Sequence, residues 1–335
     1  MLFFAYPVVS KQNDSHSDEQ RQNEDVPPLI ILFDHFPHLH HPFKLVIKQI
    51  KHSYISLKKL SVLLSERGEK TMKIGMIGTG NMGRILIEAF LESGAVKEDQ
   101  LIITNRTLEK ALDIQRHYPN VYVASGAEEV VQKAIIVFLC VKPLDIHPLL
   151  QQLSSFWTKE HCLVSITSPI SVQQLEAAVP CHVARVIPSI TNRALSGSTL
   201  ITFGQRCSRH YQTYIEQLFR HISVPSFIDH EITRIASDIA SCGPAFFSYL
   251  LQRFIEAAVK KTAITKEQAT VLTNDMIIGL GELLKSNLYT LPALQEKVCV
   301  KGGITGEGIA VLEKEMEGVF ERVFAKTHEK FKDDI

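Results

Sequence analysis

The sequence has no long apolar run, no excess of charge of either sign and no paired cysteine motif. No stretch approaches the ~20 apolar residues that span a bilayer, so we expect no contact with a membrane interior. Lys and Arg together number 36, as do Asp and Glu, and this balance gives no electrostatic footprint for nucleic acid or an anionic membrane. The six cysteines are scattered without a C-x-x-C pair, which favours reduced thiols and a cytoplasmic protein.

The first 71 residues differ in kind from the rest, because no helical or strand period persists in them. They hold six of the 14 histidines; His35, His38, His40 and His41 cluster, but we interpret them as a His-rich tract and expect no metal site. We expect residues 1–71 to be disordered or not translated. Glu66-Arg67-Gly68-Glu69 back-translates readily to GAA-AGG-GGT-GAA, which contains a bacterial ribosome-binding sequence at a suitable distance before Met72.

From Met72 the chain alternates short β-rich runs with amphipathic helices, which predicts an α/β fold with a parallel, doubly wound, Rossmann-like sheet. The strand signals end near Asp229, and long helical stretches follow. We therefore expect a dinucleotide-binding domain over 72–229 and an all-helical domain over 230–335. The expected strands are Ile74–Ile77, Leu101–Thr104, Val121–Val123, Ala134–Leu139, Cys162–Ile166 and Val183–Val186. The expected helices are Asn81–Glu92, Leu108–Gln115, Ile232–Ala240, Pro244–Lys261, Lys266–Lys285 and Ile309–Lys326.

A glycine-rich turn follows the first expected strand and opens the first expected helix, with the sequence Gly78-Thr79-Gly80-Asn81-Met82-Gly83. In this motif the first glycine permits the tight turn, the second lets backbone approach a pyrophosphate, and the third allows close packing of helix on strand. The free N–H groups of the helix N-terminus suit the phosphates. The strand before the motif and the helix after it favour a dinucleotide site over a structural turn.

The end of the second expected strand indicates which dinucleotide is bound. Sites for NAD place an acidic residue there, which bonds the ribose 2′-hydroxyl. This chain instead has Asn105-Arg106-Thr107, in which Arg106 can face a 2′-phosphate and its neighbours can donate hydrogen bonds. We therefore expect NADP(H), although Arg106 could be a solvated surface charge and Thr107 a helix cap.

Two further segments are candidates for the site. Val141-Lys142-Pro143 follows the strand at Ala134–Leu139, at the carboxyl edge of the sheet where ligands of such folds bind. In the helical half, Lys301-Gly302-Gly303-Ile304-Thr305-Gly306 leads into the last expected helix. Paired glycines before a helix N-terminus can bind an anion, and a flexible interhelical turn is the alternative. Apolar stripes on the preceding helices favour a core or a subunit interface, so we expect a homodimer or a higher homo-oligomer.

Taken together, these motifs resemble the pyrroline-5-carboxylate reductase family over Met72 to about Lys326. The residues that carry the resemblance are the glycine turn, Asn105-Arg106-Thr107, Val141-Lys142-Pro143, Gly243-Pro244-Ala245 and Gly302-Gly303-Ile304-Thr305. The resemblance implies an NADPH-binding Rossmann domain, a helical domain that interlocks in a dimer, and reduction of the cyclic imine 1-pyrroline-5-carboxylate to L-proline. It therefore implies an oxidoreductase acting on CH–NH donors, in proline biosynthesis. It also places the imine carboxylate at a Ser-Pro-Gly-Gly-Thr-Thr loop, with Thr305 as catalytic residue and Lys301, Gly302, Gly303 and Ile304 around the substrate.

The departures from the family pattern gather in the substrate half. The family Ser, Pro and first Thr of that loop are Val300, Lys301 and Ile304 here. Other family motifs are replaced by Thr167-Ser168-Pro169, by Arg185-Val186-Ile187-Pro188-Ser189-Ile190-Thr191 and by Ala240-Ser241-Cys242-Gly243-Pro244-Ala245. This pattern resembles the divergent branch encoded in bacterial late-competence operons, the ComER type.

Two functions therefore remain open. The first is NADPH-dependent reduction of pyrroline-5-carboxylate, and the second is an NADP-binding regulatory protein of competence with weak or no reductase activity. Reduction of another imine or of a β-hydroxyacid derivative ranks last, because it rests on Rossmann analogy alone.

Overall fold

The computed structural model describes residues 72–333. The expectations for residues 1–71, which include the His-rich tract and the untranslated segment, lie outside the described residues. Among the helices of the described part, none is long and apolar enough to cross a membrane.

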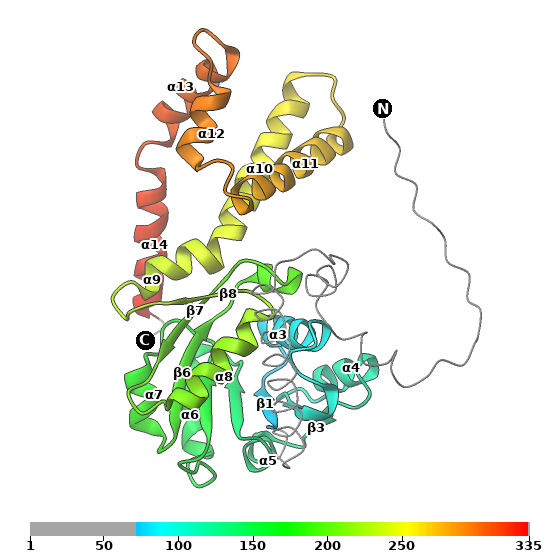
Figure 1. Cartoon of the computed structure of the whole chain (residues 1–335), viewed down its shortest axis with the longest axis vertical. Helices are drawn as coiled ribbons and strands as arrows, with labels where there is room; N and C mark the ends of the chain where they lie inside the picture. Colours follow the sequence, from blue (N-terminus) through cyan, green and yellow to red (C-terminus); the bar gives the residue numbers. More distant parts are fainter. Residues whose placement is uncertain (1–71, 334–335) are drawn as a thin grey trace, which may run out of the picture. The chain divides into compact units, whose positions relative to one another are not determined.

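An eight-stranded mixed sheet forms the centre of the first half of the described chain (Figure 1). Its strands lie in the order β3-β2-β1-β4-β5-β6-β7-β8, and all neighbours are parallel except β6 and β7. The strands are β1 Ile74–Ile77, β2 Leu101–Thr104, β3 Tyr122–Val123, β4 Ile136–Leu139, β5 Cys162–Ser165, β6 His182–Ile187, β7 Ser198–Phe203 and β8 Val224–Phe227. The six predicted strands pair in parallel, as expected. The sequence did not predict β7 and β8, and β7 adds the antiparallel pair with β6.

Helices cover both faces of this sheet, because its buried strands present apolar side chains to both sides. Along β1, Ile74 and Met76 belong to one core and Ile77 to the other. The first core receives helices α3 Asn81–Glu92, α4 Glu109–His117 and α8 Arg209–Arg220. The second receives α5 Ala127–Lys133, α6 Pro143–Gln152 and α7 Val172–Ala178. Two short 3₁₀ helices, η3 Glu98–Gln100 and η4 Ile190–Ala194, complete this half.

The strand order reverses between β1 and β4, because the chain runs outward to β2 and β3 and then returns to pair β4 with β1. In such doubly wound sheets ligands bind beside the carboxyl ends of the strands at the point of reversal. The topology therefore predicts a ligand site beside the segments that follow β1, β4 and β5.

The second half is helical, as the sequence predicts, but its helices divide differently. They are α9 Thr233–Ser237, the π-helical turn η5 Asp238–Cys242, α10 Gly243–Lys261, α11 Lys266–Lys285, α12 Leu291–Val298, α13 Ile304–Met316 and α14 Val319–Asp333. The single last helix expected over 309–326 is wrong. Glu317 leaves the helical conformation and Gly318 has a φ of 68°, so the chain turns between α13 and α14.

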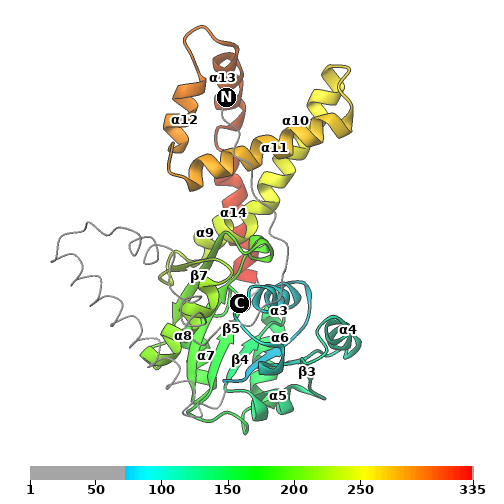
Figure 2. The same ribbon diagram turned by 45° about the vertical axis from the view of Figure 1, so that its right-hand side comes forward.

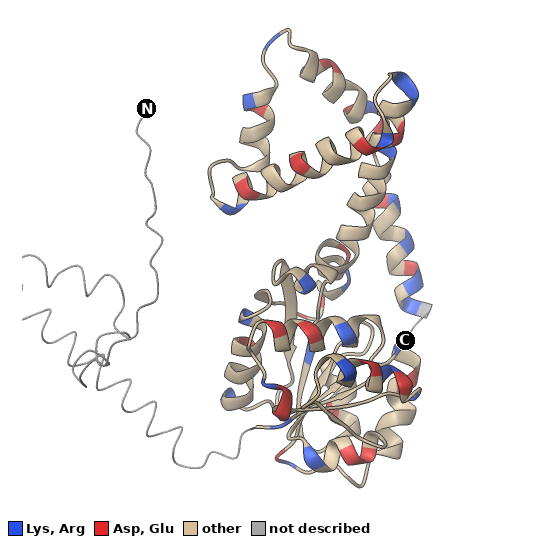
Figure 3. Ribbon diagram, turned by 90° about the vertical axis from the view of Figure 1, so that its right-hand side faces the viewer, with Lys and Arg blue, Asp and Glu red and all other residues tan. Residues whose placement is uncertain are grey.

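Helices α10 to α13 expose many apolar side chains in the single chain. Helices α10 and α11 contact each other, and they cross at an angle in Figure 2. Phe247 and Phe254 on α10 are 60% and 63% exposed, and Leu272 on α11 is 62% exposed. Contiguous exposed apolar side chains mark an interaction surface. In contrast, Lys, Arg, Asp and Glu are interspersed along the described ribbon rather than gathered by sign (Figure 3).

The packing of the sheet on α8 can be tested at Phe219, which is fully buried against Phe90 and Phe138 with ring centroids 5.3 Å and 6.2 Å away. We expect Phe219→Ala to lower the free energy of unfolding by about 3–5 kcal/mol, because it removes a buried ring and leaves a cavity. Phe227→Ala, at a ring that is 55% exposed, should cost less than half as much. Urea unfolding at one fixed protein concentration measures both, and equal losses would contradict the assignment of this core.

Candidate functional site

The glycine turn joins β1 to α3 in little space. Gly78 has a φ of +104°, and a Cβ atom there would collide with the carbonyl of Cys140 at the end of β4. A Cβ atom at Gly83, in the first turn of α3, would collide with the carbonyl oxygen of Gly78. Both positions therefore require glycine, the first for its backbone conformation and the second for the approach of helix to strand.

The remaining groups of the turn are free for a ligand. A Cβ atom at Gly80 would meet nothing within 4 Å, so the space beside it is open. Helix α3 begins after Gly80 without a side-chain cap. Its first N–H groups, which include those of Asn81 and Met82, therefore point out of the helix without a capping partner. The hydroxyl of Thr79 is buried and has no hydrogen-bond partner in the described structure. An orphaned hydroxyl, open space and uncapped N–H groups fit the phosphates of a dinucleotide.

The segment after β2 is tied to this turn. The Asn105 side-chain oxygen accepts a hydrogen bond of 3.0 Å from the backbone N–H of Thr79, and its amide donates to the Thr107 carbonyl. Arg106 and Thr107 are exposed beside it. Asn105 therefore positions the loop, whereas the guanidinium of Arg106 is available to a charged ligand group at this end of the site.

The third expected segment follows β4. Lys142 is the exposed N-cap of α6, and Pro143 occupies the first helical turn, where a missing N–H costs nothing. Cys140 directly precedes Val141 and packs against Gly78 and Gly83 of the glycine turn. Burial raises the pKa of its thiol to about 12. This thiol is therefore uncharged near neutral pH.

The glycine turn and the segment after β4 border a cleft of about 460 Å³ at the carboxyl edge of the sheet, whereas Asn105, Arg106 and Thr107 lie outside its lining. Its wall contains Lys142 and Arg234 but no Asp or Glu, so it favours an anionic ligand. The residues around the cleft are Gly80, Asn81, Met82, Cys140, Val141, Lys142, Ile166, Thr167, Ser168, Ile187, Pro188, Arg234, Ser237, Ser241 and Cys242.

The sequence reasoning did not identify the wall of this cleft that α9 and η5 supply. Arg234, Ser237, Ser241 and Cys242 face the cleft from these elements. The signal was present at Ala240-Ser241-Cys242-Gly243, where the family motif is altered, but its place in the cleft depends on tertiary contacts. Ser241 donates a hydrogen bond from its hydroxyl to the Pro188 carbonyl, which joins η5 to the end of β6.

A buried arginine also anchors α9 to the sheet. Arg185 on β6 is 1% exposed, and it donates from Nη2 to the Thr233 hydroxyl at 2.6 Å and from Nη1 to the Ser168 carbonyl at 3.2 Å. Burial lowers the pKa of Arg185 to about 10, so the guanidinium is still charged near neutral pH. Its role is to hold two walls of the cleft together.

The expected substrate loop lies elsewhere in the single chain. Gly302, with a φ of +73°, and the N-cap Gly303 lead into α13, which begins at Ile304. Thr305 is half-buried, whereas Ile304 is 92% and Val300 66% exposed. Among the described residues, none from 300 to 305 lines the cleft. The fold therefore brings the cofactor candidates together but leaves Lys301 to Thr305 apart from them.

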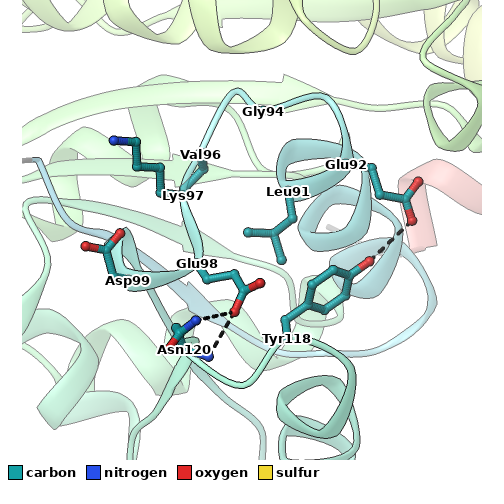
Figure 4. A pocket seen from close by; sticks show the side chains of 9 residues that line it. All are labelled: Leu91, Glu92, Gly94, Val96, Lys97, Glu98, Asp99, Tyr118 and Asn120. Atoms are coloured by element: carbon teal, nitrogen blue, oxygen red, sulfur yellow. Dashed lines mark hydrogen bonds between the residues drawn. The ribbon is translucent and has the colours of Figure 1, made fainter. Parts of the chain in front are cut away.

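A larger cavity of about 610 Å³ lies near the amino ends of β2 and β3 (Figure 4). Four of its polar residues pair with one another: Tyr118 donates to Glu92 at 3.3 Å, and the Asn120 amides donate to Glu98. It also lies at the wrong edge of the sheet for this fold. The described residues contain no group of three His, Cys, Asp or Glu side chains that could hold a metal ion.

Two family models match the chain. One is described as pyrroline-5-carboxylate reductase dimerisation and matches residues 230–334, and the other, NADP oxidoreductase coenzyme F420-dependent, matches residues 73–169. ComE operon protein 4 of Bacillus subtilis is 56% identical over 79% of this chain and 97% of its own. Pyrroline-5-carboxylate reductase 3 of the same species is 28% identical over 77% of this chain and 95% of its own.

Solved structures share the fold. The crystal structure of Plasmodium falciparum pyrroline carboxylate reductase with NADP bound superposes with a TM-score of 0.71 at 22% identity, and covers 80% of this chain and 99% of its own. The 1-pyrroline-5-carboxylate reductase of Streptococcus pyogenes gives 0.70 at 23% identity, with 78% and 98% covered. The α/β sheet followed by a helical domain, expected from the sequence, is thereby confirmed.

The orphaned hydroxyl of Thr79 provides a test of the dinucleotide turn. We expect Thr79→Val to leave the free energy of unfolding unchanged or higher, because a buried hydroxyl without a partner is removed, and to weaken dinucleotide affinity. Thr104→Val is the matched control, since that buried hydroxyl donates to the Ala124 carbonyl at 3.0 Å. The control should lose about 1–3 kcal/mol. Thermal unfolding and calorimetric titration measure both; a Thr79→Val protein with undiminished affinity would remove this residue from the site.

Proposed function

We propose that this chain, which belongs to the pyrroline-5-carboxylate reductase family and to its ComER-like branch, reduces 1-pyrroline-5-carboxylate to L-proline with NADPH. The observation that carries the proposal is the glycine turn with its orphaned Thr79 hydroxyl, whose next residues, Gly80 to Met82, border a cleft without acidic residues. A cleft of this kind suits a dinucleotide and a small carboxylate side by side. Because the six cysteines are all free thiols, we place the protein in the cytoplasm.

The cofactor would be held by three segments of this chain. Gly78 to Gly83 would bind its pyrophosphate through backbone N–H groups, and Asn105-Arg106-Thr107 would bind the 2′-phosphate. Val141-Lys142-Pro143 would border its nicotinamide end, since Val141 and Lys142 line the cleft. When bound, NADPH supplies the hydride that the C=N carbon of the imine accepts.

The chain's own residues have a limited chemical task. A protonated cyclic imine is already electrophilic, and its nitrogen keeps in the product the proton that it carried on entry. The protein therefore chiefly positions the ring and binds the carboxylate. We assign these tasks to Lys301, Gly302, Gly303, Ile304 and Thr305, with the Thr305 hydroxyl on the ring nitrogen or the carboxylate. Lys301 offers a point charge at the place where Val300 and Ile304 offer no side-chain donor.

A dimer explains why this loop is apart from the cleft in the single chain. Helices α10 to α13 expose a row of large apolar side chains, and the matching family model is described as a dimerisation domain. Burial of that surface against a second copy would remove the exposure of Phe247, Phe254 and Leu272 from water. We infer that the loop of one protomer completes the cleft of its partner.

A second candidate function is a diverged NADP-binding regulatory protein of competence with weak or no reductase activity. It is favoured by Val300 and Ile304, which are exposed apolar residues in the loop assigned to the substrate. The loss of a hydrogen bond to a charged group costs about 1.5–3 kcal/mol. The relative named ComE operon protein 4 gives this alternative its context.

The proposed reaction predicts oxidation of NADPH by the full chain in the presence of 1-pyrroline-5-carboxylate, with NADPH preferred to NADH. Arg106→Ser should reduce that preference by about 10- to 150-fold, because a charge-assisted contact to the 2′-phosphate is lost. Absorbance at the nicotinamide band measures the rates. Arg116→Ser, at an exposed arginine of α4 that pairs with Glu109 and Asp113, is the matched control and should retain the preference.

The same assay separates the two candidate functions. NADPH that binds in calorimetry but is never oxidised with the imine would exclude the reductase and leave the regulatory protein. If Arg106→Ser instead reduces the imine with an unchanged preference for NADPH over NADH, the reductase assignment stands and Arg106 is not part of the cofactor site.

The shared site predicts complementation between two defective variants. Gly80→Val should block the dinucleotide, since an added side chain there meets open space rather than protein, and Thr305→Val should lose at least about tenfold in turnover. If one protomer's loop serves its partner's cleft, refolded 1:1 mixtures should regain about a quarter of the wild-type rate, because half of the dimers contain one intact site. A mixture no faster than its components would place loop and cleft in the same chain.

A further inference from the structure

Arg234, near the start of α9, lies where two cavities meet. It borders the 460 Å³ cleft and also an adjoining cavity of about 510 Å³, and the two share Thr167, Ser168 and Cys242 as well. The adjoining cavity extends from the loop after β5 to the last helix, α14, where Lys326, Lys330 and Phe331 border it. Arg234 therefore faces any ligand long enough to pass from one cavity to the other.

The guanidinium of Arg234 is held in place from one side. Its Nη2 donates to Asp238 Oδ1 at 2.8 Å, and Asp238 is fully buried in η5. Asp238 Oδ2 accepts a second hydrogen bond of 2.7 Å from the Thr327 hydroxyl on α14. The ring of Phe331 lies 5.3 Å from the guanidinium carbon. A charged group that is restrained in this way loses little conformational freedom when it binds an anion.

The remaining nitrogens of the guanidinium are less well satisfied. Nε of Arg234 is buried without a hydrogen-bond partner in the described structure. Nη1 makes only a contact of 3.5 Å with the Ser168 hydroxyl, at the limit of a hydrogen bond. Nη1 together with the Ser168 hydroxyl forms a pair of donors that suits a carboxylate, whereas Nε lies on the edge of the guanidinium that it shares with Nη2.

The surroundings match an anionic ligand. Neither cavity has an Asp or Glu in its wall, whereas Lys142 borders the first and Lys326 and Lys330 border the second. Lys326 pairs with Glu329 at 2.6 Å. The three lysines are exposed, whereas the Arg234 side chain is only 17% exposed, so Arg234 is the most enclosed cation between the two cavities. Asp238 balances its charge in the absence of a ligand, through the contact with Nη2.

We propose that Arg234 determines substrate specificity by binding a second carboxylate, so that the preferred substrates are cyclic imines with two acid groups. This inference rests on the proposed function, in which the loop at 301–305 holds the first carboxylate. The second acid group would extend from the ring past Ser168 toward the adjoining cavity. Val300 and Ile304 weaken the first contact, and Arg234 offsets that loss for a diacid alone.

The test compares ring compounds that differ only in acid groups: pyrrolidine, proline and pyrrolidine-2,5-dicarboxylate. Calorimetry on the full chain with NADP⁺ present gives their affinities without any turnover. We expect the diacid to bind roughly 10- to 150-fold more tightly than proline, the range of one hydrogen bond to a charged group. Equal affinity of the wild-type protein for proline and the diacid would overturn the proposal.

The variant for this test is the double substitution Arg234→Gln/Asp238→Asn, which removes the cation without leaving a buried carboxylate unpaired. It should lose the preference for the diacid and keep its affinity for proline. The matched control is Arg193→Gln, an arginine that pairs with Glu88 and Glu92 away from both cavities, and it should keep the preference. A double variant that loses proline and the diacid equally would show that Arg234 is not specific for a second acid.

Ser168→Ala provides a milder variant that keeps the Arg234–Asp238 pair. It should reduce the diacid preference severalfold, and an unchanged preference would remove this hydroxyl and the path beside it from the proposal. Failure of the proposed function is separately visible, because a protein that oxidises no NADPH with any imine still reports its diacid preference in calorimetry.

Discussion

The close packing of three segments, the end of β1, the first turn of α3 and the end of β4, determines the geometry of the rest of the site. Gly78 adopts a conformation that side chains disfavour and lies against the Cys140 carbonyl, and Gly83 lies against Gly78. This contact aims the N-terminus of α3 at the carboxyl edge of the sheet, where Asn105 accepts a hydrogen bond from Thr79 and Lys142 borders the cleft. Because the strand order reverses at the same point, the open space beside Gly80 continues into the cleft.

A second constraint joins the sheet to the helical half. Arg185 reaches from β6 to Thr233, and Arg234 pairs with Asp238, which in turn accepts from Thr327 on α14. Buried charges of this kind are costly to leave unpaired, so they restrain α9, η5 and α14 in one arrangement. The same arrangement forms one wall of the cleft, and it leaves Nε of Arg234 without a partner where the two cavities meet.

The helical half carries a requirement that the single chain does not meet. Its apolar side chains are exposed on α10 and α11, and the loop assigned to the carboxylate is remote from the cleft. A second copy would meet both requirements, since it would cover the apolar surface and bring its own loop to the cleft. In our proposal, cofactor binding belongs to the sheet of each chain, whereas substrate binding is a property of the pair.

Much of the cofactor half was determined by local sequence. The glycine turn, β1, β2 and α3 appear at their predicted residues, because buried parallel strands are short apolar runs and glycine spacing specifies the turn. Local patterns did not predict the two strands after Ile187 or the break between α13 and α14 at Gly318, because strand pairing and helix packing determine these features. The domain boundaries and the roles of Arg106, Lys301 and Thr305 stay predictions. The places of Arg234 and Asp238 were decided by tertiary structure alone, because a charged pair four residues apart has the same sequence pattern on a solvated helix as in a buried wall.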